Sequence, residues 1–562
     1  MNGTRVEVIR DIETWINNSE DPQILWLLGM AGTGKTAIAW TVCSRTTEDA
    51  RIIFGGSFFC SRLTGLATQR DVRCVIPTLA LLLARKSPEF SSVLADELVR
   101  DPDVLHKQLN VQVEQLLYKP LSALKNCLTP IFFVIDGLDE CGGQPSADGS
   151  VDDVEGRRVV SEMLEALVAL ARYPVKLPVK FMVTSRPETH IRDTAVSDIS
   201  LSTILRLHSI NKAQVEEDIR LYISTILSSN HRLSAHFKPD DADMLVRVSD
   251  GLFIVAATAL KYILGAGLRG IDGATLQFKR LFNNSRDGLS IGAAAPLDKM
   301  YALILMDAAN VAESEANELQ EMLQFLGALL CTRMVLSVAA LEEILGMEKT
   351  HLRAKLAGLH AVIHVPETDE EPSLRTLHAS FGDYLFGRAD NRLRIASTAG
   401  HDTLAGGCLR RLKQNDLCFN VSRSQSSFDF NPSEAPDWLA LSLIYACMHW
   451  AHHIDSASNR AAFDSEIGLS LRPKFLFWLE VLSVLGKIGL ASVSLRIAVS
   501  AVSHVDFKGQ AATRLCYNRP KRKLFYSFSV TPAYLLRRRT SLLPRVHLTS
   551  TSLHLHLRPK TR

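Results

Sequence analysis

A segment near the N-terminus has the residue types and spacing of a phosphate-binding loop. Residues 29–36, Gly-Met-Ala-Gly-Thr-Gly-Lys-Thr, fit the pattern G-x-x-x-x-G-K-[ST]. The glycines let backbone N–H groups surround a phosphate, Lys35 can reach the β- and γ-phosphates, and the Thr36 hydroxyl can bind Mg²⁺. The sequence therefore predicts a Mg²⁺–nucleotide site formed by Gly29, Met30, Ala31, Gly32, Thr33, Gly34, Lys35 and Thr36.

Two later apolar runs end in polar residues that could complete this site. Residues 131–140 place Asp136 directly after a predicted buried strand, where a carboxylate can hold Mg²⁺ directly or through water. Asp139 and Glu140 follow, and either could act as the general base that polarises an attacking water. Residues 179–187 form a similar run, and Arg186 at its end could contact the γ-phosphate.

Alternating strand and helix patterns would position these groups. Apolar runs at 24–28, 52–60, 131–135 and 179–184 predict strands, and helical spacing recurs at 37–43, 72–84, 111–124 and 159–171. This alternation predicts an α/β fold, with a P-loop NTPase parallel sheet that has helices on both faces. Later segments predict helices at 214–227, 241–248, 253–264 and 297–308, and a hairpin that joins 362–365 to 374–377.

These patterns divide the chain of 562 residues into six predicted parts. We expect a lead helix at 1–22, the nucleotide-binding α/β domain at 23–200, a helical subdomain at 201–310, a winged-helix-like domain at 311–390, a helical region at 391–505 and a basic tail at 506–562 that is disordered.

Composition and charge limit where the protein acts and what it binds. Hydrophobic residues make up 47% of the chain, but no stretch of about 18 uncharged apolar residues occurs. The N-terminus has no apolar signal core, and the ten cysteines form no CxxC pair. We therefore expect a cytoplasmic protein with free thiols and no membrane association.

The positive net charge comes from the C-terminal tail. Thirteen of the 63 Lys and Arg residues follow Asp506, the last acid, so the rest of the chain has 50 basic residues against 60 acidic ones. Residues 520–523 and 537–539 could form nuclear-import or nucleic-acid-binding patches. The abrupt change in composition favours another interpretation, a read-through or altered-frame sequence, and we do not expect nucleic-acid binding.

Three histidines at helical spacing offer a second candidate site. His449, His452 and His453 could supply two metal ligands from one helix face. The segment lacks the glutamate of a zincin motif, and Met448 and Trp450 suit packing, so we expect these histidines to be core residues.

The motifs as a set resemble those of NACHT-type STAND NTPases. The stretches ILWLLGMAGTGKTAIAW, FFVIDGLDEC, KFMVTSRPE, SDGLFIVAATALKYI and LHASFGDYL are similar to those of NACHT proteins from mushroom-forming fungi, and the resemblance spans residues 4 to 503. It implies that the strand before Arg186 lies between the P-loop strand and the strand before Asp136. It also implies that His378, in the winged-helix-like domain, faces the diphosphate.

The resemblance also implies a mechanism. Such proteins are switches that bind ATP or GTP with Mg²⁺, hydrolyse it slowly and self-associate as homo-oligomers on activation, in some cases in fungal non-self recognition or programmed cell death. About twenty residues precede the first strand, so we expect no effector domain there. An alternative is therefore an adaptor or decoy without turnover that co-assembles with related NACHT proteins. A third is a truncated product without function.

Overall fold

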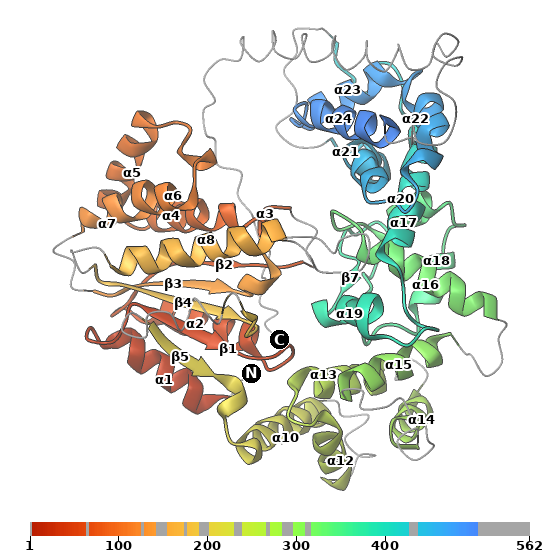
Figure 1. The fold of residues 1–562 in the computed structure, drawn as a ribbon. Helices are drawn as coiled ribbons and strands as arrows, with labels where there is room; N and C mark the ends of the chain where they lie inside the picture. Colours follow the sequence, from red (N-terminus) through yellow and green to blue (C-terminus); the bar gives the residue numbers. More distant parts are fainter. Residues whose placement is uncertain are drawn as a thin grey trace, which may run out of the picture.

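The computed structural model describes residues 3–62, 67–124, 129–141, 154–172, 177–189, 191, 202–229, 239–265, 270–283, 296–309, 316–425 and 436–503. The predicted basic tail at 506–562 lies outside these ranges. Figure 1 shows a sheet domain beside a column of helices that continues to residue 503. None of the helices in the described ranges is both long enough and apolar enough to span a bilayer.

The sheet of the N-terminal domain has five parallel strands in the order β2-β3-β4-β1-β5. Their bounds are β1 Ile24–Leu28, β2 Ile53–Phe59, β3 Ile131–Asp136, β4 Val179–Ser185 and β5 Ser202–Arg206. β4 lies between β1 and β3, as the family resemblance implies. The carboxyl ends of β1, β3 and β4, each followed by a predicted site residue, therefore meet at one edge.

Helices cover both faces of the sheet because successive strand residues point to opposite sides. Leu25, Leu27 and Phe132 pack against α1 (Val6–Asn17) and α2 (Lys35–Glu48). Ile24, Trp26 and Phe133 pack on the other face, which α8 crosses (Figure 1). The remaining helices of this domain are α3 Ala67–Arg70, α4 Val75–Ala84, α5 Pro88–Arg100, α6 Leu109–Gln112, α7 Lys119–Ser122 and α8 Val154–Ala171. The predicted α/β class is confirmed.

Several elements differ from the sequence prediction. β5 was missed because an edge strand, with one side partly exposed, lacks the continuous apolar run of β1 and β3. This strand pairs with β1 just beyond the predicted boundary at 200. The helix predicted at 111–124 is divided into α6, a π-helical turn at Val113–Tyr118 and α7, where Pro120 removes a backbone donor. α5 was also missed, although Ser87 caps it and Pro88 begins it.

Beyond β5, the regular elements in the described ranges are helices and one hairpin. A first group of helices contains α10 Lys212–Ser229, α12 Pro239–Ser249, α13 Phe253–Gly265, α14 Gly270–Asn283 and α15 Pro296–Ala308. A second contains α16 Ala316–Leu330, α17 Val338–Leu345, α18 His351–Leu356 and α19 Ala379–Asp383, and a third contains α20 Ser397–Leu412, α21 Leu441–Asp455, α22 Asp464–Leu471, α23 Phe475–Val484 and α24 Leu490–Ser503. One continuous hydrophobic core joins the three groups.

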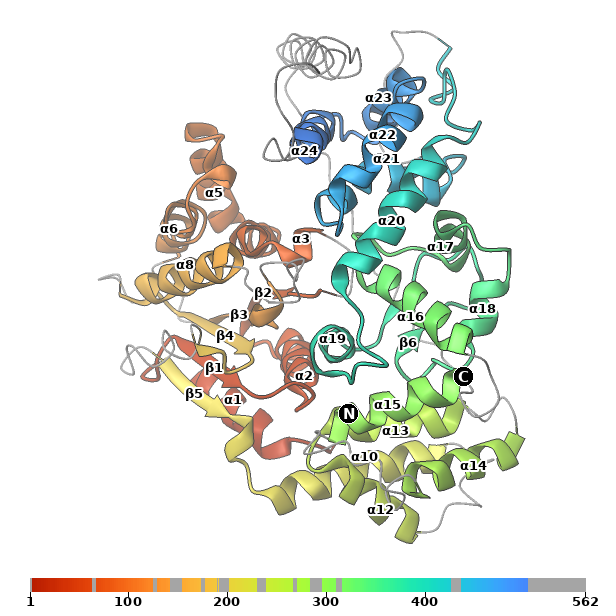
Figure 2. The same ribbon diagram turned by 45° about the vertical axis from the view of Figure 1, so that its right-hand side comes forward.

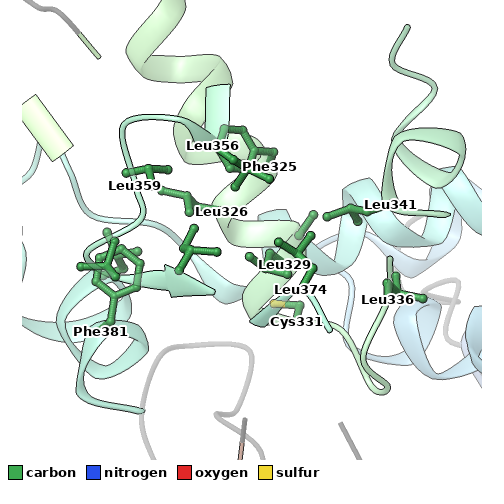
Figure 3. Packing of buried hydrophobic residues seen from close by; sticks show 14 of the residues in the cluster. Phe325, Leu326, Leu329, Cys331, Leu336, Leu341, Leu356, Leu359, Leu374 and Phe381 are labelled. Atoms are coloured by element: carbon green, nitrogen blue, oxygen red, sulfur yellow. The ribbon is translucent and has the colours of Figure 1, made fainter. Parts of the chain in front are cut away.

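The second group has the winged-helix-like succession expected from the sequence. The hairpin pairs β6 (Ile363–His364) with β7 (Arg375–Thr376) in antiparallel fashion. Figure 3 shows its core, in which Phe325 and Leu329 of α16 lie among residues of the neighbouring elements, including Leu341, Leu356 and Phe381. This packing fixes the position of α19, which faces the edge of the sheet near α2 (Figure 2).

Candidate nucleotide-binding site

The phosphate-binding pattern forms a loop between β1 and α2, as the sequence predicts. Gly32 and Gly34 have φ angles of 78° and 94°, in the left-handed region that favours glycine. The Nζ atom of Lys35 donates to the carbonyl oxygens of Gly29 and Met30, at 2.7 and 3.1 Å. Burial lowers the Lys35 pKa, although Asp139 opposes this effect. A buried ammonium beside glycine-rich backbone, at the start of a helix, is a suitable environment for a phosphate.

The loop also contacts the helical subdomain. The backbone N–H of Ile254, in α13, donates to the carbonyl oxygen of Gly32 at 3.2 Å. A Cβ atom added to Gly32 would lie 2.0 Å from Cγ2 of Ile254, so this glycine is required by packing as well as by its φ angle.

Asp136 lies at the end of β3 and faces the start of α2. The Thr184 hydroxyl donates to its Oδ1 atom at 2.6 Å, and the Thr36 side chain also hydrogen-bonds to Asp136. Burial raises the Asp136 pKa, while these two hydrogen bonds work in the opposite direction. A hydroxyl and a buried carboxylate side by side are oxygen ligands of the kind that Mg²⁺ takes in P-loop proteins, so the residues present fit the ion.

The next two acids have different environments. Asp139 is an ion-pair partner: its Oδ2 atom lies 3.0 Å from Nε of Arg186, and its Oδ1 atom accepts from the Arg186 backbone N–H at 3.0 Å. Glu140 accepts from the backbone N–H of Arg62 at 3.1 Å. Burial, followed by the charge of Asp139, raises the Glu140 pKa to about 7. Glu140 can therefore exchange a proton near neutral pH.

Arg186 connects the sheet edge to the winged-helix-like domain. Its Nη1 atom donates to Oδ2 of Asp383, at the end of α19, over 2.9 Å. Burial opposes the charge of this guanidinium, but Asp383 and Asp139 outweigh burial and raise the Arg186 pKa. Sequence reasoning missed Asp383, although it stands five residues after the candidate His378 in LHASFGDYL.

His378 lies in the same neighbourhood and caps α19. Its Nδ1 atom accepts from the Ser380 backbone N–H at 3.1 Å and lies 2.6 Å from the Ser380 hydroxyl. Burial and then the positive charge of Arg186 lower the His378 pKa to about 4, with a smaller effect from Lys35. The structure therefore brings His378, Arg186 and Lys35 together, and the imidazole is neutral at physiological pH.

Two arginines near the site were not predicted. Arg62 follows β2, and its Nη2 atom donates to the Asp139 carbonyl oxygen at 2.8 Å. Arg5 precedes α1, and its Nη2 atom donates to the carbonyl oxygen of Thr33 at 3.3 Å. The Arg5 guanidinium also lies 5.1 Å from the ring centre of Phe253, at the start of α13. A charged residue within three positions of the end of β2 is the signal that could have identified Arg62.

The predicted histidine group lies elsewhere, between α20 and α21. His453 is fully buried, with its Nδ1 atom 2.9 Å from Nδ1 of His401 and its Nε2 atom 2.7 Å from the Tyr445 hydroxyl. His452 contacts the Arg333 guanidinium. Within the described ranges, no group of three or more His, Cys, Asp or Glu residues is arranged to hold a metal ion.

Comparisons with known proteins agree with this geometry. The family model described as Nephrocystin 3, N-terminal, matches residues 4–186. The vegetative incompatibility protein HET-E-1 of Podospora anserina is 21% identical over 537 residues, which cover 87% of this chain and 35% of HET-E-1. The chain thus spans about a third of the length of that relative.

Two solved structures are among those similar to the chain. A STAND ATPase with a tetratricopeptide repeat sensor from Pyrococcus horikoshii is 10% identical, with a TM-score of 0.36, over 95% of this chain and 64% of its own. Cdc6p from Pyrobaculum aerophilum is 11% identical, with a TM-score of 0.33, over 72% of this chain and 94% of its own. The phosphate-binding motif, the strand order and the two sequence matches agree in making the chain similar to NACHT-type STAND P-loop NTPases.

Proposed function

We propose that the chain is a nucleotide-driven switch that binds ATP or GTP with Mg²⁺, hydrolyses it slowly and self-associates in the triphosphate-bound form. The main support is the position of Arg186, which contacts Asp139 at the sheet edge and Asp383 of α19. One guanidinium therefore connects the nucleotide-binding domain to the winged-helix-like domain.

Each residue of the site has a proposed part in this cycle. Residues 29–34 surround the phosphates with backbone N–H groups, and Lys35 exchanges its bonds to Gly29 and Met30 for phosphate oxygens. Thr36 and Asp136 hold Mg²⁺, which when bound supplies positive charge to neutralise the phosphates. Glu140 accepts a proton from the attacking water because burial and the charge of Asp139 raise its pKa to about 7.

Arg186 and His378 would report the state of the nucleotide. A γ-phosphate competes with Asp383 for the Arg186 guanidinium, so triphosphate binding weakens a contact to α19. His378 has its Nδ1 atom occupied by Ser380, which leaves Nε2 to donate toward a diphosphate if that nitrogen carries the proton. Both residues therefore hold α19 at the sheet edge when a diphosphate is bound, and a triphosphate weakens this hold, which gives the two positions that a switch requires. A role in vegetative incompatibility, taken from the name of the relative HET-E-1, is part of this proposal.

The first experiment tests nucleotide binding. Fluorescent ATP and GTP analogues are titrated into the full chain, into Lys35→Ala and into Lys349→Ala, a matched control at an exposed lysine. We expect Lys35→Ala to weaken binding by at least about 100-fold because a charge-assisted contact to phosphate is lost, while Lys349→Ala binds normally. Size-exclusion chromatography with light scattering should then show triphosphate-dependent self-association of the wild type and of Lys349→Ala, but not of Lys35→Ala. Unchanged affinity and association in Lys35→Ala would refute the proposal.

A second experiment separates the switch from an adaptor without turnover. Phosphate release is measured with saturating ATP or GTP in the wild type and in Glu140→Gln. Release that disappears in the variant supports slow hydrolysis. Tight binding without release from either protein supports an adaptor or decoy that co-assembles with related NACHT proteins.

A further inference from the structure

Two cysteines meet directly behind the acidic edge of the site. Cys60 follows β2, and Cys141 follows Glu140 at the end of the short turn Leu138–Glu140. Their Sγ atoms are 2.7 Å apart, and the two residues are 5% and 4% exposed. Both are free thiols.

The backbone holds both cysteines in place. The Cys60 N–H donates to the Asp136 carbonyl oxygen at 2.9 Å, which continues the pairing of β2 with β3. The Cys141 N–H donates to the Leu138 carbonyl oxygen at 3.1 Å, which closes the turn. The Sγ–Sγ distance is only about 0.7 Å longer than a disulfide bond, so a small side-chain movement would suffice to form one.

We propose that Cys60 and Cys141 are a modification site, at which a peroxide oxidises the pair to a reversible intramolecular disulfide. One thiolate attacks the peroxide, the O–O bond breaks, and a sulfenic acid forms with release of water or an alcohol. The second thiol displaces hydroxide from that sulfur, which leaves as water after protonation. Each sulfur gives up one electron, the peroxide takes up both, and a cellular dithiol reverses the reaction.

The disulfide would act on residues that already connect the segment after β2 to the segment after β3. Arg62, two residues after Cys60, donates its backbone N–H to Glu140 and its side chain to the Asp139 carbonyl oxygen. A disulfide would hold Glu140 in this Arg62-bound position. This consequence rests on the proposed function. We expect oxidation to lower turnover about tenfold, less than the roughly 10²- to 10⁴-fold contribution of a general base, because Glu140 is restrained and not removed. Nucleotide affinity should be unchanged.

The reaction should be slow because the thiols are buried. Burial raises the pKa of the Cys60 thiol well above its usual range, and Cys141, Asp136 and Glu140 act in the same direction. The thiolate is the reactive form, so the oxidation is best followed above neutral pH.

Peptide mass spectrometry tests the disulfide independently of turnover. The full chain is treated with hydrogen peroxide at about pH 8, near the usual pKa of a thiol, then blocked with N-ethylmaleimide and digested without reduction. Trypsin leaves Cys127 and Cys141 on one peptide, so a protease that cleaves before aspartate is added to separate them. We expect a peptide that links Cys60 to Cys141 and disappears with dithiothreitol. The variant Cys141→Ser should lack it, and the control Cys43→Ser should retain it.

Two results would overturn the proposal. In the first, a peroxide dose fully oxidises the exposed Cys418, but Cys60 and Cys141 can still be alkylated once the protein is unfolded. The other is Cys141 linked to Cys74 instead, a thiol whose pKa is raised by burial and, to a lesser extent, by Asp71 and Cys141.

Phosphate release by the same samples tests the effect on Glu140. We expect the oxidised wild type to lose turnover and to regain it with dithiothreitol, and Cys141→Ser to be insensitive to peroxide. If the linked peptide forms but turnover is unchanged, the proposed effect of the disulfide on Glu140 is wrong. A reduced protein with no turnover would count against the proposed hydrolysis, while the peptide result would still decide the disulfide.

Discussion

The acidic edge of the sheet and the histidine group of α20 and α21 both gather ionisable side chains in a buried setting, but their environments differ. At the sheet edge, acids alternate with cations, and the Glu140 pKa is raised to about 7. In the histidine group, burial is the main cause that lowers the pKa of His401 to about 4 and that of His449 to about 3. The sheet edge can therefore exchange protons near pH 7, whereas the histidines stay uncharged at that pH.

The difference shows what spacing alone leaves undetermined. His449, His452 and His453 have the spacing of a ligand pair, but the contacts of His452 and His453 are to Arg333, Tyr445 and His401. Asp136 ends a parallel strand and Glu140 follows it, at the sheet edge where ligands of such folds bind. The position of a polar residue in the fold therefore distinguishes a ligand site from the protein core better than the residue type does.

The largest expected effect comes from removing the proposed base. Glu140→Gln should lower the rate of phosphate release about 10²- to 10⁴-fold, the usual contribution of a general base, with nucleotide affinity retained. Pre-steady-state phosphate release and analogue titration measure the two quantities. The exposed Glu348 provides the control Glu348→Gln. If Asp139→Asn abolished release while Glu140→Gln did not, the assignment of the two acids would have to be reversed.

Acid should lower turnover through the sheet edge and folding stability through the histidine group. Turnover should rise with pH through about 7, because Glu140 must be deprotonated to accept a proton. The histidines have folded pKa values below the ordinary value, so the unfolded chain binds more protons. Folding stability should therefore be complete above about pH 6.5 and fall on acidification, by about 1.4 kcal/mol per pH unit for each histidine.

Urea unfolding at a series of pH values measures this stability change. His401→Asn removes one of the histidines and should flatten the dependence between pH 6.5 and 5 relative to the wild type. Equal slopes for the two proteins would show that the histidine group does not couple folding to protons, and the contrast between the two regions would fail.

The smallest effect is expected at the connection between the domains. Asp383→Asn removes one of the two acids that contact Arg186. Because the side chains of Arg186 and Asp383 are both partly exposed, removing their ion pair should cost about 1 kcal/mol of interaction energy. This corresponds to a roughly fivefold faster release of bound diphosphate. Stopped-flow release of a fluorescent diphosphate measures it, with Glu348→Gln again as the control. A slower release would contradict the proposed role of this ion pair.

The sequence predicted the parts of the site that depend on local pattern. The loop at 29–36 and the acid at Asp136 follow strands whose apolar runs are unmistakable, and the family resemblance predicted the place of β4. The choice between Asp139 and Glu140 could not be made, because it depends on which acid Arg186 contacts. Asp383, Arg62 and the pairing of Cys60 with Cys141 depend on contacts between segments distant in sequence.

The contact between Gly32 and Ile254 has a further consequence. A phosphate that rotates the Gly32 peptide must alter a hydrogen bond to α13, and a displacement of α13 must alter the loop that receives the phosphate. The two events share one free energy of coupling, which acts equally in both directions. Any binding partner that shifts the helical subdomain therefore changes nucleotide affinity by the same factor by which nucleotide changes the affinity for that partner.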